Sequence, residues 1–289
     1  MRGDFAVFVL THGRPGRVVT LDTIRRCGYT GRWYMVVDNE DDTVDEYRER
    51  YGEDRVIVFD KELEAKLTDS MDTSKNRGVI VYARNVCFRL ASELGLTYFL
   101  ELDDDYKWME HRYIEDGRLK SVEVRDADGL FEAYCEFLRV SEAQSVAMAQ
   151  GGDFIGGAES ANFRRGCLRK AMNTFFCMTE RPFRFVGRVN EDVNTYVGLG
   201  QTGMLFLTAC GANIVQLPTQ SNAGGMTGEY LSSGTYVKSF YTVMIAPSCV
   251  RVKTMGNRHR RMHHHIDWRY AVPKIVSGRY CKRLVGYGS

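Results

Sequence analysis

The sequence predicts a single-domain α/β fold in which helices flank a mixed sheet, and three observations indicate this. Short apolar runs rich in β-branched and aromatic residues, typical of buried strands, alternate with apolar residues at helical spacing. Polar and acidic residues follow where these runs end, as they do at the carboxyl edge of an open α/β sheet. The 289 residues, 44% of them hydrophobic and 26% charged, are enough for a large core.

The first third of the chain has the pattern of a doubly wound, nucleotide-binding half. In chain order we expect a strand at 5–10, a helix from Pro15 to Gly28, strands at 33–37 and 56–59, and a helix at 78–94 that ends on Gly95. Carboxylates follow the strands of this β-α-β-β order, so the residues that bind a ligand are expected at the strand ends.

The rest of the chain predicts further strands and helices and two loops. We expect a hairpin at 106–124, a helix at 128–142, strands at 145–149 and 172–178, a helix that Asn190 caps, two strands within 204–217 joined at Gly211, a helix at 235–245 and a strand at 248–254. Residues 218–234 are a candidate lid. We expect one integrated domain made of a nucleotide-binding half (1–105), an acceptor and catalytic half (106–250) and a basic C-terminal segment (251–289).

Composition limits the possible environments and partners. Residues 38–54 hold nine acids against two arginines, whereas 251–283 hold ten Lys and Arg against one acid, which suggests a C-terminus that faces a polyanion. No two of the eight cysteines are closer than ten residues, which excludes paired zinc motifs and favours reduced thiols. No window approaches the ~20 apolar residues of a membrane span. We expect a cytoplasmic protein, in the host cytoplasm if it is viral.

The most informative stretch is 97–106, an apolar run that stops at three consecutive aspartates. A buried strand cannot carry three adjacent charges, so Asp103, Asp104 and Asp105 are expected just past its end, at the carboxyl edge of the sheet. Clustered carboxylates repel one another unless a cation lies between them, and such oxygen ligands suit Mg²⁺ or Mn²⁺. An acidic turn without a metal is the alternative.

Several of these segments together resemble a glycosyltransferase of the GT-A fold, a Rossmann-like mixed sheet, over roughly residues 5–215. The segments are Thr11 and Arg14 after the first strand, Asp38 after the second, Ala83-Arg84-Asn85 on a helix, the three aspartates, and Asn190-Glu191-Asp192. The run 187–196 and the glycine-rich loop at 151–154 more specifically resemble bacteriophage glycosyltransferases associated with TET/JBP-type pyrimidine hydroxylases, which decorate DNA bases. The family's usual Asp-x-Asp is Asp-Asp-Asp here, which leaves the metal-binding pair open.

The resemblance implies transfer of a hexose from a nucleoside-diphosphate sugar, with a UDP-sugar as the expected donor and Mn²⁺ or Mg²⁺ as cofactor. For the donor we expect Thr11, Arg14 and Asp38 near the base and ribose, Asp104 at the ribose, and Arg84 near the phosphates, a helix-surface salt bridge being the alternative for Arg84. For the metal we expect Asp103 and Asp105, joined by His264 or His265 unless the histidines belong to a solvated tail. Asp192, with Glu191 second, is the expected general base, and helix capping is the alternative.

The expected acceptor is a hydroxymethylated pyrimidine, such as hydroxymethylcytosine, in DNA. The residues expected to contact it combine a flexible loop with basic and aromatic side chains: Gly151, Gly152, Asp153, Arg258, Arg260, Arg261 and Trp268. A protein or glycan acceptor is the alternative within the same class. A metal-dependent nucleotidyltransferase is a second alternative, although its glycine-rich phosphate motif is absent from the sequence. A non-enzymatic nucleic-acid binder explains the basic segment but not the acidic strand end.

Overall fold

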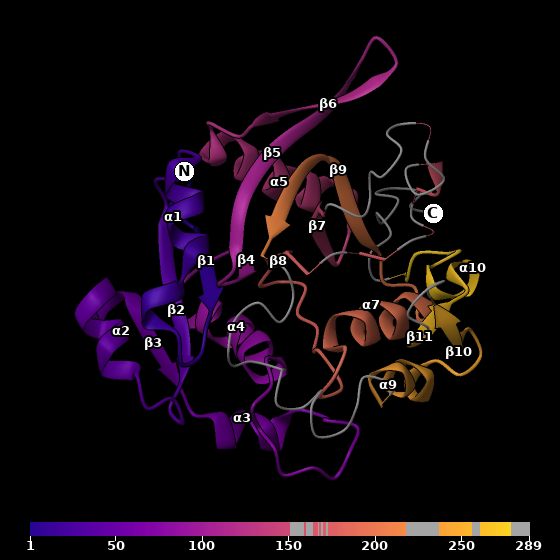
Figure 1. Cartoon of the computed structure of the whole chain (residues 1–289), viewed down its shortest axis with the longest axis horizontal. Coiled ribbons are helices and arrows are strands. Elements are labelled where there is room, and N and C mark those ends of the chain that lie inside the picture. The colour runs from indigo at the N-terminus through magenta and orange to yellow at the C-terminus, as the bar shows by residue number, and fades with distance from the viewer. Residues whose placement is uncertain are drawn as a thin grey trace, which may run out of the picture.

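A nine-stranded mixed sheet with helices on both faces forms the body of the protein, in the strand order β3-β2-β1-β4-β8-β7-β9-β5-β6 (Figure 1). The computed structural model describes residues 1–150, 159, 164–166, 168, 170–171, 173–217, 237–255 and 261–278, without the side chains of residues 237, 255 and 261. The mixed α/β fold with flanking helices that the sequence predicts is confirmed.

The strands are buried because each face of the sheet has its own core. In β1 (Phe5–Leu10), Phe5, Val7 and Val9 join one apolar cluster, and the alternate residues join the other. The first cluster includes residues of α1 (Val19–Arg26), α2 (Val44–Tyr51) and α5 (Ala127–Ser141). The second includes residues of α4 (Val81–Glu93). A strand covered on both faces must be apolar throughout, which explains the continuous apolar run in the sequence.

Four parallel strands make the first half of the sheet. They are β1, β2 (Arg32–Asp38), β3 (Val56–Phe59) and β4 (Tyr98–Asp103). The expected strands and the helices α1 and α4 are confirmed, with a 3₁₀ turn at Pro15–Arg17 before α1. The predicted β-α-β-β order is wrong, because α2 lies between β2 and β3 and α3 (Lys61–Leu67) follows β3. Tyr47 is the only buried residue that α2 contributes, so its sequence has little helical apolar periodicity.

The second half of the sheet adds antiparallel pairings. Its elements are β5 (Tyr106–Glu115) and β6 (Arg118–Glu123), which form the expected hairpin, α5, β7 (Ser145–Ala149), β8 (Phe175–Met178), α7 (Glu191–Gln201) and β9 (Phe206–Gln216). The two strands expected within 204–217 are in fact one. β9 runs through Gly211, pairing in parallel with β7 first and antiparallel with β5 afterwards. The change of partner explains why the glycine interrupts the sequence pattern without ending the strand.

The basic C-terminal segment is folded where the structure describes it. α9 (Val237–Ile245) leads into β10 (Val250–Met255), which pairs with β11 (Arg261–Ile266) before the short helix α10 (Trp268–Ala271). These elements share a third apolar cluster with α7 that includes Ile266, Trp268 and Ala271, so this part of the segment is not a solvated tail. A Cβ on Gly200 of α7 would lie 2.2 Å from the carbonyl oxygen of Ala271, which shows how closely α7 approaches this segment.

Two smaller expectations concern membranes and thiols. No helix in the ranges that the structure describes is long and apolar enough to cross a membrane. The six cysteines that can be placed are free thiols, as expected for reduced side chains: Cys27, Cys87, Cys135, Cys177, Cys210 and Cys249. The candidate lid at 218–234 lies outside the described residues.

Candidate active site

The three aspartates lie at the carboxyl end of β4, in the turn that leads into β5. Asp103 is the last residue of β4, and Asp104 and Asp105 connect it to Tyr106. The start of α1 holds this turn: the backbone carbonyl of Asp104 accepts a hydrogen bond from the backbone N–H of Val19 at 2.9 Å. The Thr20 hydroxyl donates to the Asp103 carbonyl at 2.6 Å. The position expected from the sequence is thus fixed by backbone contacts as well as by chain direction.

Asp104 lies with the side chains that follow β1. Its Oδ2 accepts a hydrogen bond from the Thr11 hydroxyl at 2.7 Å and lies 3.2 Å from an Arg14 guanidinium nitrogen. The Tyr47 hydroxyl, 2.8 Å from that of Thr11, completes the group. Burial raises the pKa of Asp104, although Arg14 and Thr11 oppose the effect. The structure therefore brings together three residues expected at the donor, Thr11, Arg14 and Asp104.

Asp38, at the end of β2, is held by His12 and Lys61. His12 Nδ1 is 2.9 Å from its Oδ2, and Lys61 Nζ is 3.1 Å from its Oδ1. Burial raises the pKa of Asp38, but the His12 hydrogen bond and the Lys61 charge outweigh it, so the pKa lies below its usual value. Asp38 is thus an ionised, oriented carboxylate at the sheet edge. His12, which is about half exposed, was not singled out from the sequence.

A buried arginine joins the acidic strand to the start of α7. Arg84, from α4, is only 1% exposed and lies near three carboxylates: 2.9 Å from Asp103, 3.2 Å from Glu191 and 3.5 Å from Glu101. Burial raises the pKa of Glu101 to about 8, and burial together with Asp192 raises that of Glu191 to about 7. Arg84 therefore forms salt bridges, but inside the site and not on the helix surface.

Whether Asp103 and Asp105 suit a metal ion depends on which of their carboxylate oxygens already have a hydrogen-bond partner. Asp103 Oδ2 accepts a hydrogen bond from the Asn173 amide at 3.1 Å, and Asp105 Oδ2 accepts one from Gln216 at 3.1 Å. Asp105 Oδ1 is buried and has no hydrogen-bond partner among the described residues. Burial and the neighbouring Asp103 raise the pKa of Asp105 to about 6, so a nearby cation would favour its charged form.

Within the described part of the chain, no group of three or more His, Cys, Asp or Glu side chains is arranged to hold a metal ion. Mg²⁺ usually binds through one or two carboxylates and completes its shell with water and substrate phosphates. Asp105 Oδ1 is the unpartnered oxygen that suits such a site, whereas Arg84 and Asn173 bond to the two oxygens of Asp103, so Asp103 would have to exchange one of these partners for the ion.

The first turn of α7 supplies the second pair of carboxylates. Asp192 Oδ2 lies 3.4 Å from Lys170 Nζ. Burial raises the pKa of Asp192, but Lys170 and Arg84 outweigh it, so the pKa lies below its usual value and the carboxylate is ionised at neutral pH. Glu191 instead faces Arg84. Of the two, Asp192 is therefore the carboxylate whose lowered pKa keeps it charged, which makes it the better candidate for a base.

His264 comes to the same place from β11. Its Nδ1 is 3.3 Å from the side-chain amide nitrogen of Asn190, which also donates to the carbonyl of Lys238 at 2.8 Å. Asn190 precedes α7 with a φ of 58° but makes no side-chain cap, so the expected capping bond is not formed. Burial lowers the pKa of His264 to about 4, which leaves a neutral imidazole able to bind a metal. His265 is exposed.

Family comparison agrees with this arrangement. Residues 5–225 match the model of the TET-associated glycosyltransferases. The chain belongs to this family. Comparison with curated proteins gives no match.

Solved structures similar to this TET-associated glycosyltransferase are distant in sequence. Glucosyl-3-phosphoglycerate synthase from Mycobacterium tuberculosis with Mg²⁺ and UDP matches at 10% identity and TM-score 0.42, over 91% of this chain and 87% of that one. The same enzyme with Mn²⁺, UDP-glucose and phosphoglyceric acid matches at 12% and 0.41, over 92% and 90%. A putative UDP-N-acetylglucosamine pyrophosphorylase from Entamoeba histolytica matches at 10% and 0.33, over 96% and 74%. At these TM-scores and identities, the likeness says nothing further about the fold of this chain or about its ligands.

The residues expected at the acceptor are only partly placed in this TET-associated glycosyltransferase. Gly151, Gly152, Asp153, Arg258 and Arg260 lie outside the described residues, and Arg261 is described only as the first backbone position of β11. Trp268 packs parallel to Tyr196 of α7, with ring centroids 6.1 Å apart and planes at 29°.

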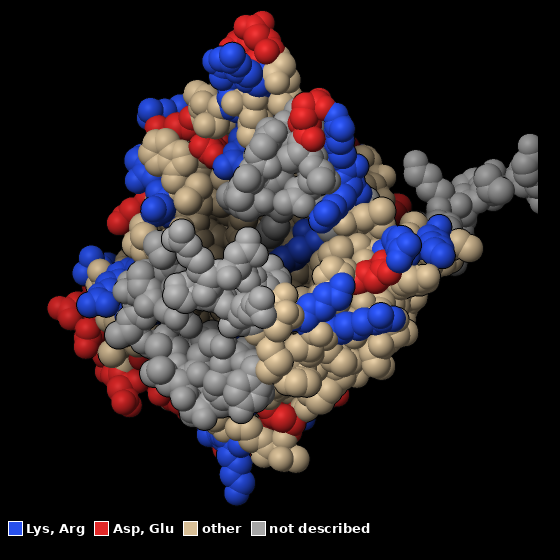
Figure 2. All heavy atoms as spheres, turned by 45° about the vertical axis from the view of Figure 1, so that its right-hand side comes forward, with Lys and Arg blue, Asp and Glu red and all other residues tan. Residues whose placement is uncertain are grey.

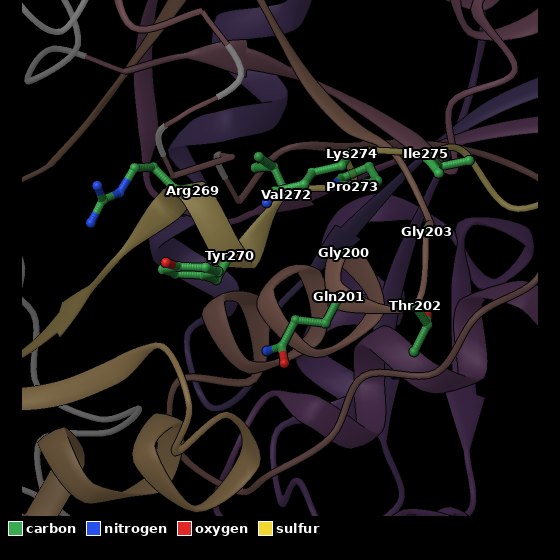
Figure 3. Close-up of a pocket in the computed structure, with 10 residues that line it drawn as sticks. All are labelled: Gly200, Gln201, Thr202, Gly203, Arg269, Tyr270, Val272, Pro273, Lys274 and Ile275. Carbon is green, nitrogen blue, oxygen red and sulfur yellow. The ribbon is translucent and has the colours of Figure 1, made fainter.

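A cavity of about 380 Å³ lies at the far end of α7, beside Gly200, Gln201 and Tyr270 (Figure 3). It is separated from Glu191 and Asp192 by the length of the helix, and it contains none of the expected catalytic residues.

Proposed function

We propose that this TET-associated glycosyltransferase moves a sugar from a nucleoside-diphosphate sugar, expected to be a UDP-sugar, to the hydroxymethyl group of a pyrimidine base in DNA, with Mn²⁺ or Mg²⁺ as cofactor. One observation carries the proposal. In a member of a glycosyltransferase family, the carboxylates at the end of β4 and at the start of α7 meet around a single arginine, Arg84. Donor activation and acceptor activation both need carboxylates, and here the two sets lie side by side.

The donor site in this proposal lies at the carboxyl ends of β1, β2 and β4. Open α/β sheets bind ligands at that edge, and Thr11, Arg14 and Asp38 all lie there. Asp38 is ionised and oriented by His12 and Lys61, which suits it to accept hydrogen bonds from ribose hydroxyls. Arg14, 20% exposed beside Asp104, supplies positive charge on the same side.

Asp103 and Asp105 would hold the metal ion in this proposal, with His264 as a further ligand and His265 as the alternative. Both carboxylates lie in one turn, and Asp105 Oδ1 is a buried oxygen without a hydrogen-bond partner among the residues described. When bound, a dication neutralises the charge that the diphosphate gains as it leaves. Gln216 holds the other oxygen of Asp105, and Arg84 and Asn173 hold the two oxygens of Asp103 until the ion replaces one of them.

Asp192 is the proposed base. Its carboxylate accepts the proton of the acceptor hydroxyl while that oxygen forms a bond to the anomeric carbon, and the bond from this carbon to the diphosphate oxygen breaks. The lowered pKa keeps Asp192 ionised at neutral pH, and Lys170 holds its Oδ2. Arg84 orients Glu191 and Asp103 through its two salt bridges with them. Glu191 is therefore proposed as a positioning residue, and it is the second choice for the base.

DNA is the proposed acceptor for two reasons. The family is associated with TET enzymes, and the sequence resembles glycosyltransferases that act beside pyrimidine hydroxylases. The C-terminal segment carries ten Lys and Arg within residues 251–283, which suits a polyanion better than a neutral sugar. A base inside a duplex cannot reach Asp192, so it must be extruded or presented on a single strand. We further propose that the whole chain works as one domain, with the boundaries at 105 and 250 marking its functional parts.

A screen of acceptors and donors tests the proposed function. The protein is incubated with Mn²⁺ and each of several sugar nucleotides, and the acceptors are hydroxymethylated DNA, unmodified DNA, a peptide mixture and simple sugars. We expect hydroxymethylated DNA alone to gain the mass of a sugar. Transfer to a peptide or sugar, with none to DNA, would contradict the proposal.

A further inference from the structure

A cavity of about 530 Å³ lies beside the proposed base and is not used by the donor site. It is bordered by the first residues of α7, by β11 and by α10, and it includes Lys170, His264 and Trp268. Figure 2 shows Lys and Arg side chains bordering a hollow on the face that carries the C-terminal elements. Residues from α7, β11 and α10 therefore form one surface next to the active site, although they are not contiguous in the sequence.

One contact connects this cavity to the proposed base, and a second connects it to the residue that precedes α7. Lys170, in its wall, lies 3.4 Å from Asp192 Oδ2. His264, also in its wall, lies 3.3 Å from the amide nitrogen of Asn190, the residue before Glu191. Through Lys170 the cavity therefore adjoins Asp192, the residue that an acceptor hydroxyl has to reach.

The chemistry of the walls combines cations with an aromatic surface. Arg165, Lys170 and Arg269 contribute positive charge, and Arg269 remains 72% exposed although it pairs with Asp267. Trp268 contributes a partly exposed ring, which stacks on the buried ring of Tyr196. Cations bind phosphate oxygens, and aromatic rings of this kind stack on nucleobases. A neutral sugar acceptor has neither a phosphate nor a flat ring for these groups to recognise.

The size of the cavity points the same way. A volume of about 530 Å³ lies in the ordinary range for a drug-sized ligand, which is larger than a lone phosphate requires. One nucleotide has the two parts that this lining matches, a planar base and an anionic phosphate.

We propose that this cavity is the acceptor subsite and that it holds a nucleotide of single-stranded or locally opened DNA. Arg165 and Arg269 contact backbone phosphates, Trp268 supplies the stacking surface, and Lys170 and His264 form the wall shared with the active site. The proposal rests on the proposed function, because it assigns a place to that function's DNA acceptor.

The test compares two double variants that remove the same charge. Arg165→Gln with Arg269→Gln changes the cavity. Arg89→Gln with Arg139→Gln changes two exposed arginines on α4 and α5, outside the cavity lining. The measurements are the KM for a hydroxymethylated single-stranded oligonucleotide and the salt dependence of its Kd, with thermal unfolding to confirm that both variants fold.

For the cavity variant we expect a KM raised by about 10-fold or more and a salt slope reduced by about 1.4, because each single-strand phosphate contact contributes about 0.7 to that slope. The matched control should stay within about 2-fold of the wild-type KM, since its arginines contact no phosphate. Equal effects in the two variants, or no effect in either, would overturn the subsite while wild-type modification of DNA upholds the proposed function. If the wild type modifies no DNA, the proposed function fails and the subsite fails with it.

Discussion

Removing the positive charge of Arg84 should lower the stability of the folded protein. Arg84→Met keeps most of the side-chain volume but leaves Glu101, Asp103 and Glu191 without their shared cation. The side chains of these carboxylates are 0%, 16% and 13% exposed. Breaking a buried ion pair by removing one partner typically costs about 3–5 kcal/mol, because the remaining charge is uncompensated. We expect a loss of that size in the free energy of unfolding, measured by urea titration at about pH 8.

The loss should depend on pH in a defined direction. An acid whose pKa is higher in the folded chain than in the unfolded chain stabilises the fold below its ordinary pKa, and this contribution is lost as pH rises through the folded value. The folded pKa is about 8 for Glu101 and about 7 for Glu191. Near pH 5 both are protonated, so Arg84 then neutralises little beyond Asp103. The deficit of Arg84→Met should therefore be smaller near pH 5 than near pH 8.

Two further variants test whether the uncompensated carboxylates cause the loss of stability. Arg89→Met lies on the same helix, but Arg89 is 48% exposed and, among the described residues, its salt bridge is with Glu93, so its loss should cost less than about 1 kcal/mol. Adding Glu101→Gln to Arg84→Met should recover part of the stability at pH 8, since it removes one uncompensated charge. A deficit for Arg84→Met that is below about 1 kcal/mol, or that is equal at the two pH values, would refute the account of this cluster.

Three other predictions address the metal, the base and the approach of α7 to the C-terminal segment. Asp105→Asn should abolish transfer, as a chelator should for the wild type, and full activity of this variant would contradict the metal mechanism. Because the pKa of Asp105 is about 6, the variant should be at least as stable as the wild type in thermal unfolding at pH 8. Asp192→Asn should bind donor normally yet turn over roughly 10²–10⁴-fold more slowly in a steady-state assay, and the same profile in Glu191→Gln alone would move the assignment by one residue. Gly200→Ala should lower the melting temperature, since its Cβ would meet the Ala271 carbonyl oxygen at 2.2 Å, and an unchanged melting temperature would show that the backbone yields easily.

Much of the fold follows from local sequence because the strands are covered on both faces. The runs at 5–10 and 56–59 are apolar throughout, the run at 145–149 is apolar after Ser145, and the three coincide with β1, β3 and β7. α2 is not predicted from the sequence because it buries little besides Tyr47. β11 is not predicted either, because its run of basic residues has no alternation of apolar and polar side chains.

The site is predictable only to the extent that chain direction decides it. Carboxylates after a buried strand must lie at the sheet edge, which places Asp103, and a helix start places Asp192. Nothing in the sequence shows that Arg84 is buried between these two regions, since Glu191 lies 107 residues away from it. Lys170 and Asn173 are missed for the same reason, because their contacts with Asp192 and Asp103 arise from long-range packing.

Mass spectrometry of a hydroxymethylated oligonucleotide tests the central claim most directly. The oligonucleotide is incubated with the protein, a UDP-sugar and Mn²⁺, in parallel with Asp192→Asn, Asp105→Asn and an unmodified oligonucleotide of the same sequence. We expect the wild type to add one sugar mass per hydroxymethylated base, and neither variant nor the unmodified oligonucleotide to give this product at comparable rates. Addition to the unmodified oligonucleotide, or wild-type rates for both variants, would contradict this expectation.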